Sequence, residues 1–149
     1  MSRYVSAIYS DDIRHEVGGK ISIIGIYGPA LLVQNFPATL PKLCMQVQVR
    51  TPADNPFKSV TFKILHNKFE LANVSVSEQD ILQATPDRAE DAERDNSANQ
   101  VMTFNFVFSP VVLTEPGSIQ IRAITESEEL KGPSLRIDQA PEGTEFAPA

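Results

Sequence analysis

Residues 8–28, IYSDDIRHEVGGKISIIGIYG, contain the feature that most constrains the fold, which is the Gly18-Gly19 pair. Glycine enters the positive-φ positions of a two-residue type I′ or II′ turn without steric cost. We therefore expect a β-hairpin in which Val17 and Lys20 face each other on either side of this turn.

The segments around the turn are both predicted to be strands. Residues 4–9 form a first strand, which the polar run Ser10-Asp11-Asp12 interrupts, and residues 13–17 could continue as the first arm of the hairpin. Residues 20–27 are mostly β-branched or aromatic, as is typical of strands. Gly25 lies inside this second segment and favours a β-bulge, since a glycine within a strand often marks a kink or a close backbone approach.

Period-two alternation recurs along the chain and indicates the fold class. It is clearest over residues 43–50, where apolar and polar side chains alternate. This alternation predicts a strand with one buried and one solvent-exposed face. Further strands are predicted over residues 60–64, 69–76, 102–108, 119–123 and 135–137, with turn residues between them. This spacing predicts an all-β fold, a single immunoglobulin-like antiparallel β-sandwich of about eight strands.

Phe104, Phe106 and Phe108 lie in one line on one face of the strand predicted over residues 102–108. We expect this line to form the centre of the hydrophobic core. Phe106→Ala should then lower the free energy of unfolding by about 3–5 kcal/mol, as is typical of a buried phenylalanine.

One short helix or acidic loop is expected as an insertion at about residues 78–100. Ser77 and Asp80 form a capping-box pattern at its start, and Pro86 limits the helix. Residues 87–100 have only alanines as apolar groups, so they bury too little surface to offset their ordering entropy.

The formal net charge of −6 argues against binding to a nucleic-acid backbone, which needs clustered Lys and Arg. Residues 78–97 hold seven acidic residues against two arginines, and residues 138–149 hold three acids and no base. The acidity therefore belongs to the insertion and the C-terminal segment. The predicted layout is a β-sandwich domain over residues 1–138 and a flexible tail over residues 139–149.

Cys44 is the only cysteine, so an intrachain disulfide is impossible and a zinc site built on several thiolates is excluded. The chain shows neither a signal-peptide pattern nor an apolar run of about 18 residues. These observations indicate a cytoplasmic protein without a membrane span. Gly18-Gly19-Lys20 lacks the other residues of a phosphate-binding loop, and no cofactor is expected.

The opening Asp11-Asp12-x-Arg14-x-Glu16-x-x-Gly19-Lys20, continued by an Ile-Gly-x-Tyr strand, resembles a family of small uncharacterised bacterial proteins. Phe36-Pro37 and Pro116-Gly117 follow in the order expected for that family. The resemblance covers most of the chain and implies a β-sandwich. It implies no known activity, substrate or cofactor.

The same opening segment holds the candidate site. Its acidic residues and His15 could bind a divalent cation, but calcium takes about 6–8 oxygens and no second acidic group with EF-hand spacing is present. The structural alternative is that Asp11 or Asp12 accepts backbone N–H bonds, while Arg14 pairs with a carboxylate and is oriented towards Glu16. The candidate binding residues are Asp11, Asp12, Arg14, Glu16 and Lys20, and none is assigned as catalytic or as a metal ligand.

Two classes of function remain open. The first is a non-enzymatic protein-interaction or assembly module that presents the opening loop, the acidic insertion or an exposed sheet edge, through which a homo-oligomer could also form. The alternative is a small-ligand or divalent-metal-dependent enzyme that uses Asp11, Asp12, His15 and Glu16. No catalytic motif accompanies His15 or His66, which favours the first class.

Limited proteolysis should cut the chain first within residues 87–99 or in the tail after Asp138, because these segments bury little apolar surface. Mass spectrometry of the first fragments identifies the sites. Protection of both segments while other loops are cut would contradict the prediction.

Overall fold

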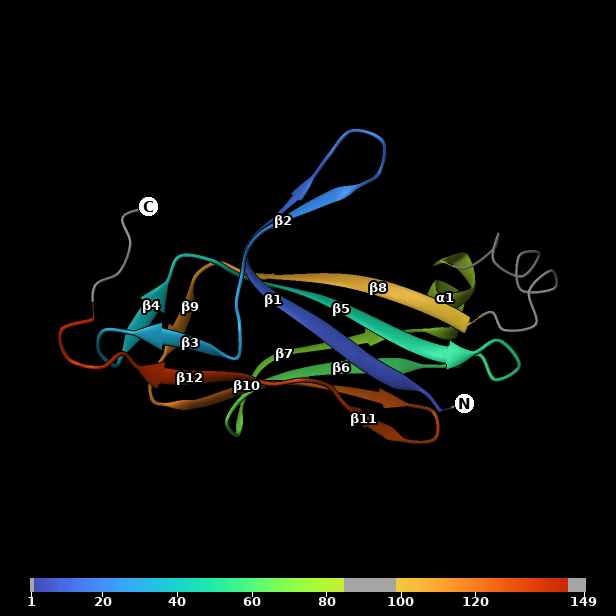
Figure 1. The fold of residues 1–149 in the computed structure, drawn as a ribbon. Coiled ribbons are helices and arrows are strands. Elements are labelled where there is room, and N and C mark those ends of the chain that lie inside the picture. Colours follow the sequence, from blue (N-terminus) through green and yellow to red (C-terminus); the bar gives the residue numbers. More distant parts are fainter. Residues whose placement is uncertain (1, 85–98, 145–149) are drawn as a thin grey trace.

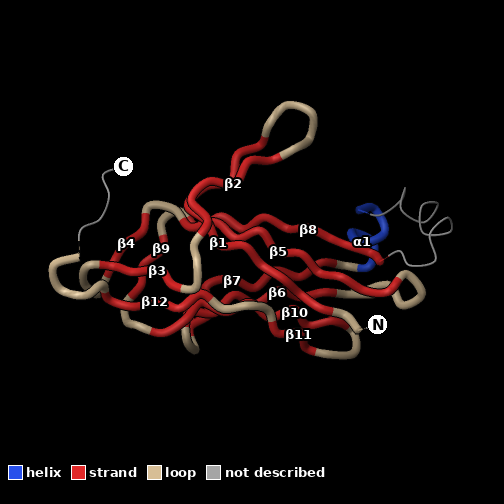
Figure 2. Tube along the Cα trace, viewed as in Figure 1, coloured by secondary structure: helices blue, strands red, loops and turns tan. Residues whose placement is uncertain are grey.

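The computed structural model describes residues 2–84 and 99–144. The strands are β1 (Tyr4–His15), β2 (Ile21–Ile26), β3 (Ala30–Val33), β4 (Ala38–Leu40), β5 (Leu43–Pro52), β6 (Val60–His66), β7 (Phe69–Val76), β8 (Asn99–Phe108), β9 (Val111–Leu113), β10 (Gly117–Thr125), β11 (Glu129–Lys131) and β12 (Leu135–Gln139). The helix α1 spans Glu78–Ala84. Strands dominate the described chain, as Figure 2 shows, so the all-β prediction is confirmed.

Two β-sheets form the layers of a sandwich (Figure 1). One sheet has the order β2-β1-β5-β8, and the other has the order β3-β12-β10-β6-β7, with β11 paired to β10. A small ribbon of β4 and β9 lies at one end. The pairing is antiparallel as expected except at one edge, where β12 pairs with β3 in parallel.

The core lies between β5 of the first sheet and β6 and β10 of the second. The alternation seen in the sequence places one set of side chains inward, as expected for half-buried strands. The fully buried side chains of these three strands that face inward are Leu43, Met45, Val47, Val49, Val60, Phe62, Ile64, Ile119, Ile121 and Ala123. Phe62 is the largest of them and faces the other sheet.

The phenylalanines of β8 are not the centre of the core, so that prediction is wrong. Phe104 and Phe106 are half-buried, because β8 is the terminal strand of its sheet. They pack against the core through Phe62, whose ring centroid lies 4.7 Å from that of Phe104 and 5.6 Å from that of Phe106. The alternation was predicted correctly, but it could not show that the strand lies at an edge.

The first strand does not stop at Ser10, contrary to the prediction. β1 continues to His15, and Ser10 is fully buried between Cys44 of β5 and Ile26 of β2. The polar run therefore lies inside a paired strand. Ser10 pairs with strands on both sides and Asp12 pairs with Ile24 of β2, so tertiary pairing overrides the unfavourable strand propensity of aspartate.

The β1–β2 hairpin forms with a longer tip than predicted. The amide of Glu16 donates to the carbonyl of Lys20 (2.8 Å), so Val17, Gly18 and Gly19 form the tip. Both glycines have positive φ, 89° and 78°, as the turn prediction required. Backbone pairing of Glu16 with Lys20 replaces the expected facing pair of Val17 and Lys20.

The β1–β2 ladder lacks the pair Asp11↔Gly25 but keeps the same register on either side of it, from Ser10↔Ile26 to His15↔Ile21. The bulge prediction is therefore not supported by the pairing. Instead Gly25 has a φ of 70°, and a Cβ placed on it would lie 2.3 Å from a carboxylate oxygen of Asp11. Glycine allows both the left-handed backbone and the close approach of that side chain.

Helix α1 begins as the sequence predicts. The amide of Asp80 donates to Ser77 Oγ (3.2 Å), and the amide of Ser77 donates to the Asp80 carboxylate (3.4 Å), which completes a capping box. Ile81 is buried and attaches the helix to the core. No helix in residues 2–84 and 99–144 is long and apolar enough to cross a membrane.

The expected acidic insertion and tail are described only in part. Residues 85–98 and 145–149 lie outside the described residues, whereas residues 99 and 100 already belong to β8. Gln139 belongs to β12, and the amide of Ala140 donates to the carbonyl of Val33 (2.8 Å). The division into a domain over residues 1–138 and a flexible tail stays a prediction.

Arg3 holds one end of the sandwich together. Its side chain is 2% exposed, and Nη2 donates to Glu126 Oε1 at 2.7 Å. Nε donates to Thr51 Oγ1 (2.9 Å), and Nη2 also donates to the carbonyl of Pro56 (3.0 Å). The guanidinium lies over the ring of Phe57, with Cζ 4.7 Å from the centroid. Hydrogen bonding to Arg3 lowers the pKa of Glu126.

The positions of the phenylalanines generate a stability prediction. Phe62→Ala should lower the free energy of unfolding by about 3–5 kcal/mol, whereas Phe106→Ala should cost clearly less, because its side chain is half-buried and leaves a cavity open to solvent. Denaturant unfolding of both variants measures the difference. Equal losses would contradict the edge position of Phe106.

Candidate functional site

The distal half of the β1–β2 hairpin projects from the sandwich (Figure 1). We call residues 10–27 the hairpin arm. The arm begins where β1 leaves β5, since Ser10↔Cys44 is the last pair between those strands. All five candidate binding residues lie on this arm or at its tip. The sequence therefore predicted their proximity correctly, because a hairpin brings its two strands together.

Asp12 is the centre of the charged contacts on the arm. Its carboxylate accepts from Lys42 Nζ at 2.6 Å and from Arg14 Nε at 3.2 Å. The hydrogen bond from Lys42 is the main cause that lowers the pKa of Asp12, and the bond from Arg14 adds to it. The same contact raises the pKa of Lys42. Asp12 thus joins the arm to the start of β5.

Asp11 has a different role from Asp12. Its Oδ1 accepts a hydrogen bond of 2.5 Å from the hydroxyl of Tyr27, and its carboxylate covers the Cα of Gly25. Burial raises the pKa of the Tyr27 hydroxyl, and the bond to Asp11 raises it further. Tyr27 therefore stays protonated and donates throughout the physiological pH range. Its amide donates to the carbonyl of Tyr9 (2.9 Å), which fixes the base of the arm.

The structural alternative for the cluster is correct in one respect and wrong in two. Arg14 does pair with a carboxylate, that of Asp12. The expected pairing of Arg14 with Glu16 is not found, since within the described residues the ion pair of Arg14 is with Asp12. The hydrogen bonds found for Asp11 and Asp12 come from side chains rather than from backbone amides. Alternation along β1 separates the two neighbouring aspartates onto opposite faces.

The described residues contain no group of three or more His, Cys, Asp or Glu side chains that could hold a metal ion. His15 is exposed on the arm, whereas His66 is buried at the end of β6 and its Nε2 lies 3.0 Å from the carbonyl oxygen of Glu115. Cys44 is buried beside Asp11. These three side chains therefore do not form a joint site.

Sequence reasoning missed Lys42 and Tyr27 as members of the cluster. Lys42 is 30 residues away from Asp12 along the chain, and no local pattern indicates that pairing. Tyr27 was predicted as the last residue of the apolar strand that follows the Gly-Gly turn. No pattern in the sequence indicated that its hydroxyl contacts Asp11. Contacts of this kind follow from the ladder register, which the sequence did not determine.

Apolar side chains on the arm are exposed. Val17 at the tip is 93% exposed, Ile26 is 61% exposed and Ile24 is 43% exposed. β2 is also the terminal strand of its sheet, and its sequence ISIIGI contains no charge. An uncharged apolar strand at a sheet edge is a surface to which another chain can bind.

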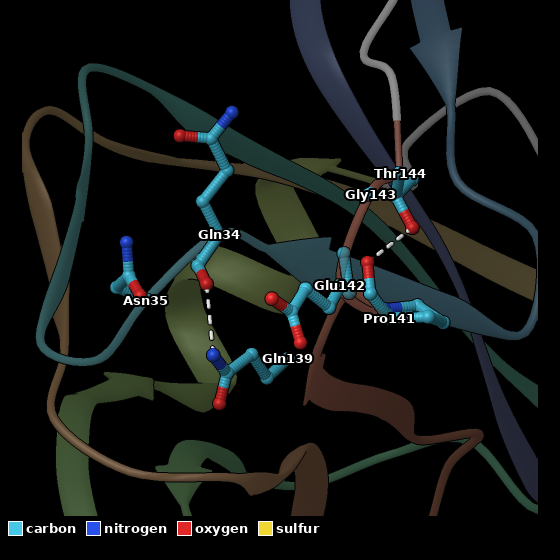
Figure 3. A pocket seen from close by; sticks show the side chains of 8 residues that line it. Gln34, Asn35, Gln139, Pro141, Glu142, Gly143 and Thr144 are labelled. Atoms are coloured by element: carbon cyan, nitrogen blue, oxygen red, sulfur yellow. Dashed lines mark hydrogen bonds between the residues drawn. The ribbon is translucent and has the colours of Figure 1, made fainter.

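A polar hollow of about 470 Å³ lies away from the arm, between residues 139–144 and the loop after β3 (Figure 3). Gln139 Nε2 donates to the carbonyl of Gln34 (3.0 Å) across it. The turn after β12 is closed by Thr144 Oγ1, which donates to the carbonyl of Pro141 (2.5 Å). The lining offers hydrogen-bonding groups, and none of the candidate residues belongs to it.

The fold and the hairpin arm together define the structural class of this protein, which is an all-β sandwich with a projecting hairpin. The chain belongs to a family of unknown function (DUF6941), whose model matches residues 5–138. This confirms the expected membership of an uncharacterised family. The shared opening motif and the bacterial origin stay predictions. The searches of curated proteins and of solved structures returned no match.

The ion pairs of Asp12 generate a pH prediction. Because the folded state lowers its pKa below the ordinary 3.8, Asp12 stabilises the fold above that pH and loses its contribution as the pH falls below it. The melting temperature of Asp12→Asn should therefore lie slightly below that of the unchanged protein at neutral pH, and the difference should shrink as the pH falls below 3.8.

Thermal unfolding across a pH series measures this difference. Asp54→Asn, which changes an exposed carboxylate in the turn after β5, is the matched control and should leave the melting temperature unchanged. A chelator that lowers the melting temperature, with recovery on adding calcium or magnesium, would contradict the ion-pair assignment and favour a metal site.

Proposed function

We propose that this protein is a non-enzymatic protein-binding module and that its partner docks on the hairpin arm. The observation that carries the proposal is the exposure of Val17, Ile24 and Ile26 on an arm that projects from the sandwich (Figure 1). Exposed apolar side chains gathered on one projecting element are costly unless they are covered in a complex.

The arm is held in place before any partner binds. Lys42 and Tyr27 bond the two aspartates at its base, and the Glu16–Lys20 bond closes its tip. A preorganised surface loses less conformational entropy on association, which favours affinity. The same contacts support a binding role over the enzyme alternative, since the carboxylates of Asp11 and Asp12 are already engaged by side chains of the chain itself.

Strand addition is the binding mode that fits this arm. β2 is terminal in its sheet, so an extended segment of a partner can pair with its outer edge. The partner would meet alternating apolar side chains, Ile24 and Ile26, on one face of the strand. A mixed cluster of Arg14, Lys20 and Glu16 near the tip offers charged groups of both signs at the rim.

Three finer features belong to the same proposal. The strand order supports an immunoglobulin-like topology, because β1, β5 and β8 correspond to strands A, B and E of such a sandwich, and β12, β10 and β6 to strands G, F and C. A cytoplasmic location is supported by the single, buried Cys44. The net charge of −6 supports a protein partner over nucleic acid or an anionic membrane.

Affinity capture with surface variants tests the proposal. The double variant Ile24→Ser, Ile26→Ser removes apolar side chains of the arm, and the matched control Leu32→Ser, Val112→Ser removes two of similar exposure on β3 and β9. Protein captured from native lysate by the unchanged chain and by the control should be lost with the arm variant. Loss of about tenfold in affinity, measured with the purified partner, is expected.

Circular dichroism and thermal unfolding confirm that both double variants fold. A partner that is retained equally by the arm variant and by the control would contradict docking on the arm. Capture of no partner, combined with metal-dependent turnover of a small substrate, would favour the enzyme alternative.

A further inference from the structure

Within the described part of the chain, the terminal strand β8 has no neighbouring strand on its outer side over residues 102–108. It spans Asn99–Phe108, ten residues, and pairs in unbroken register with β5 from Leu43↔Phe108 to Pro52↔Asn99. Its sequence, NQVMTFNFVF, contains no charge and no proline. Proteins usually prevent a free edge from pairing with another chain by placing charges, prolines or bulges there or by keeping the strand short. β8 has none of these features over residues 102–108.

The other terminal strands differ from β8 in this respect. β7 contains Glu70 and a register irregularity between Ile64 and Leu65 of its partner strand. β2 is six residues long, shorter than β8, and its edge belongs to the hairpin arm, whereas β3 is only four residues long. Among these terminal strands in the described part of the chain, β8 is therefore the best suited to accept a further strand, over residues 102–108.

The core is open beside this edge. Phe104, Phe106 and Phe108 face the opposite sheet, yet all three are half-buried. Val74 of β7 pairs with the fully buried Phe62 and is nevertheless 42% exposed. Apolar side chains that face inward are thus left uncovered on the side of the sandwich between β7 and β8, and a strand added to β8 would cover them.

We propose that β8 pairs antiparallel with β8 of a second copy of this chain, so that two four-stranded sheets join into one continuous sheet. A twofold axis at Asn105 places Phe104 of one copy opposite Phe106 of the other, and Thr103 opposite Val107. The strand is its own suitable partner, because an uncharged edge meets no like charge when it pairs with itself. Each copy supplies the same row of phenylalanines to the joint core.

Asn105→Lys tests the proposal without altering the core, because Asn105 is exposed on the outer face of β8. The twofold would place two lysines opposite each other, so the dimer should dissociate at a concentration at least about tenfold higher. Gln46→Lys is the matched control, since Gln46 pairs with Asn105 in the same sheet but lies on the interior strand β5. Analytical ultracentrifugation over a concentration series measures both.

Cross-linking gives a second and independent readout. In Asn105→Cys the new thiols face each other across the twofold at a distance that a disulfide can span, whereas Cys44 is buried. Mild oxidation should therefore give a covalent dimer that is absent from the unchanged chain. A dimer that is weakened by Asn105→Lys but not by Gln46→Lys, together with this cross-link, supports the proposal.

Two results would overturn it. The first is an unchanged chain that stays monomeric up to about 100 μM, which would leave the edge for a strand of a different protein. The second is a dimer that Asn105→Lys does not weaken and that Asn105→Cys does not cross-link, which would place the interface on another surface. Either result leaves the proposed role of the hairpin arm standing, since that role concerns β2.

Discussion

The buried guanidinium of Arg3 is the interaction on which one whole end of the sandwich depends. A charge with a side chain 2% exposed must be fully hydrogen-bonded, because an unpaired buried charge is strongly destabilising. Its acceptors come from the end of β5, from the loop before β6 and from the turn after β10. Satisfying one side chain therefore fixes the relative positions of both sheets and of two connections.

The charged side chains of the hairpin arm also need hydrogen-bond partners, but here the partners hold a projecting element in place. Neighbouring aspartates in a strand point to opposite faces, so each must find its own partner. Asp11 is satisfied by Tyr27 within the arm, and Asp12 is satisfied by Lys42 at the start of β5. These contacts connect the two strands of the hairpin and attach it to the sandwich without burying its apolar surface. That combination, a firmly held element with exposed isoleucines, is what favours binding over chemistry.

Most strands could be predicted from the sequence, because alternation is a local property of the chain. The strands beginning at Leu43, Val60 and Phe69, and the capping box at Ser77, all appear as expected. The predictions that failed concerned the position of a strand within its sheet. Phe106 was expected at the centre of the core, yet it lies on an edge strand, and the pattern of a half-buried strand is the same in both places.

The sequence by itself determined that the chain forms a β-sandwich, that Gly18 and Gly19 turn a hairpin, and that the opening charged residues lie together on it. Each of these follows from residues close together along the chain. Only the tertiary structure decided that Lys42 pairs with Asp12, that Ser10 is buried within a continuous β1, and that β2 and β8 end their sheet. Those features depend on strand order and register, which are set by contacts between distant segments that the local pattern does not encode.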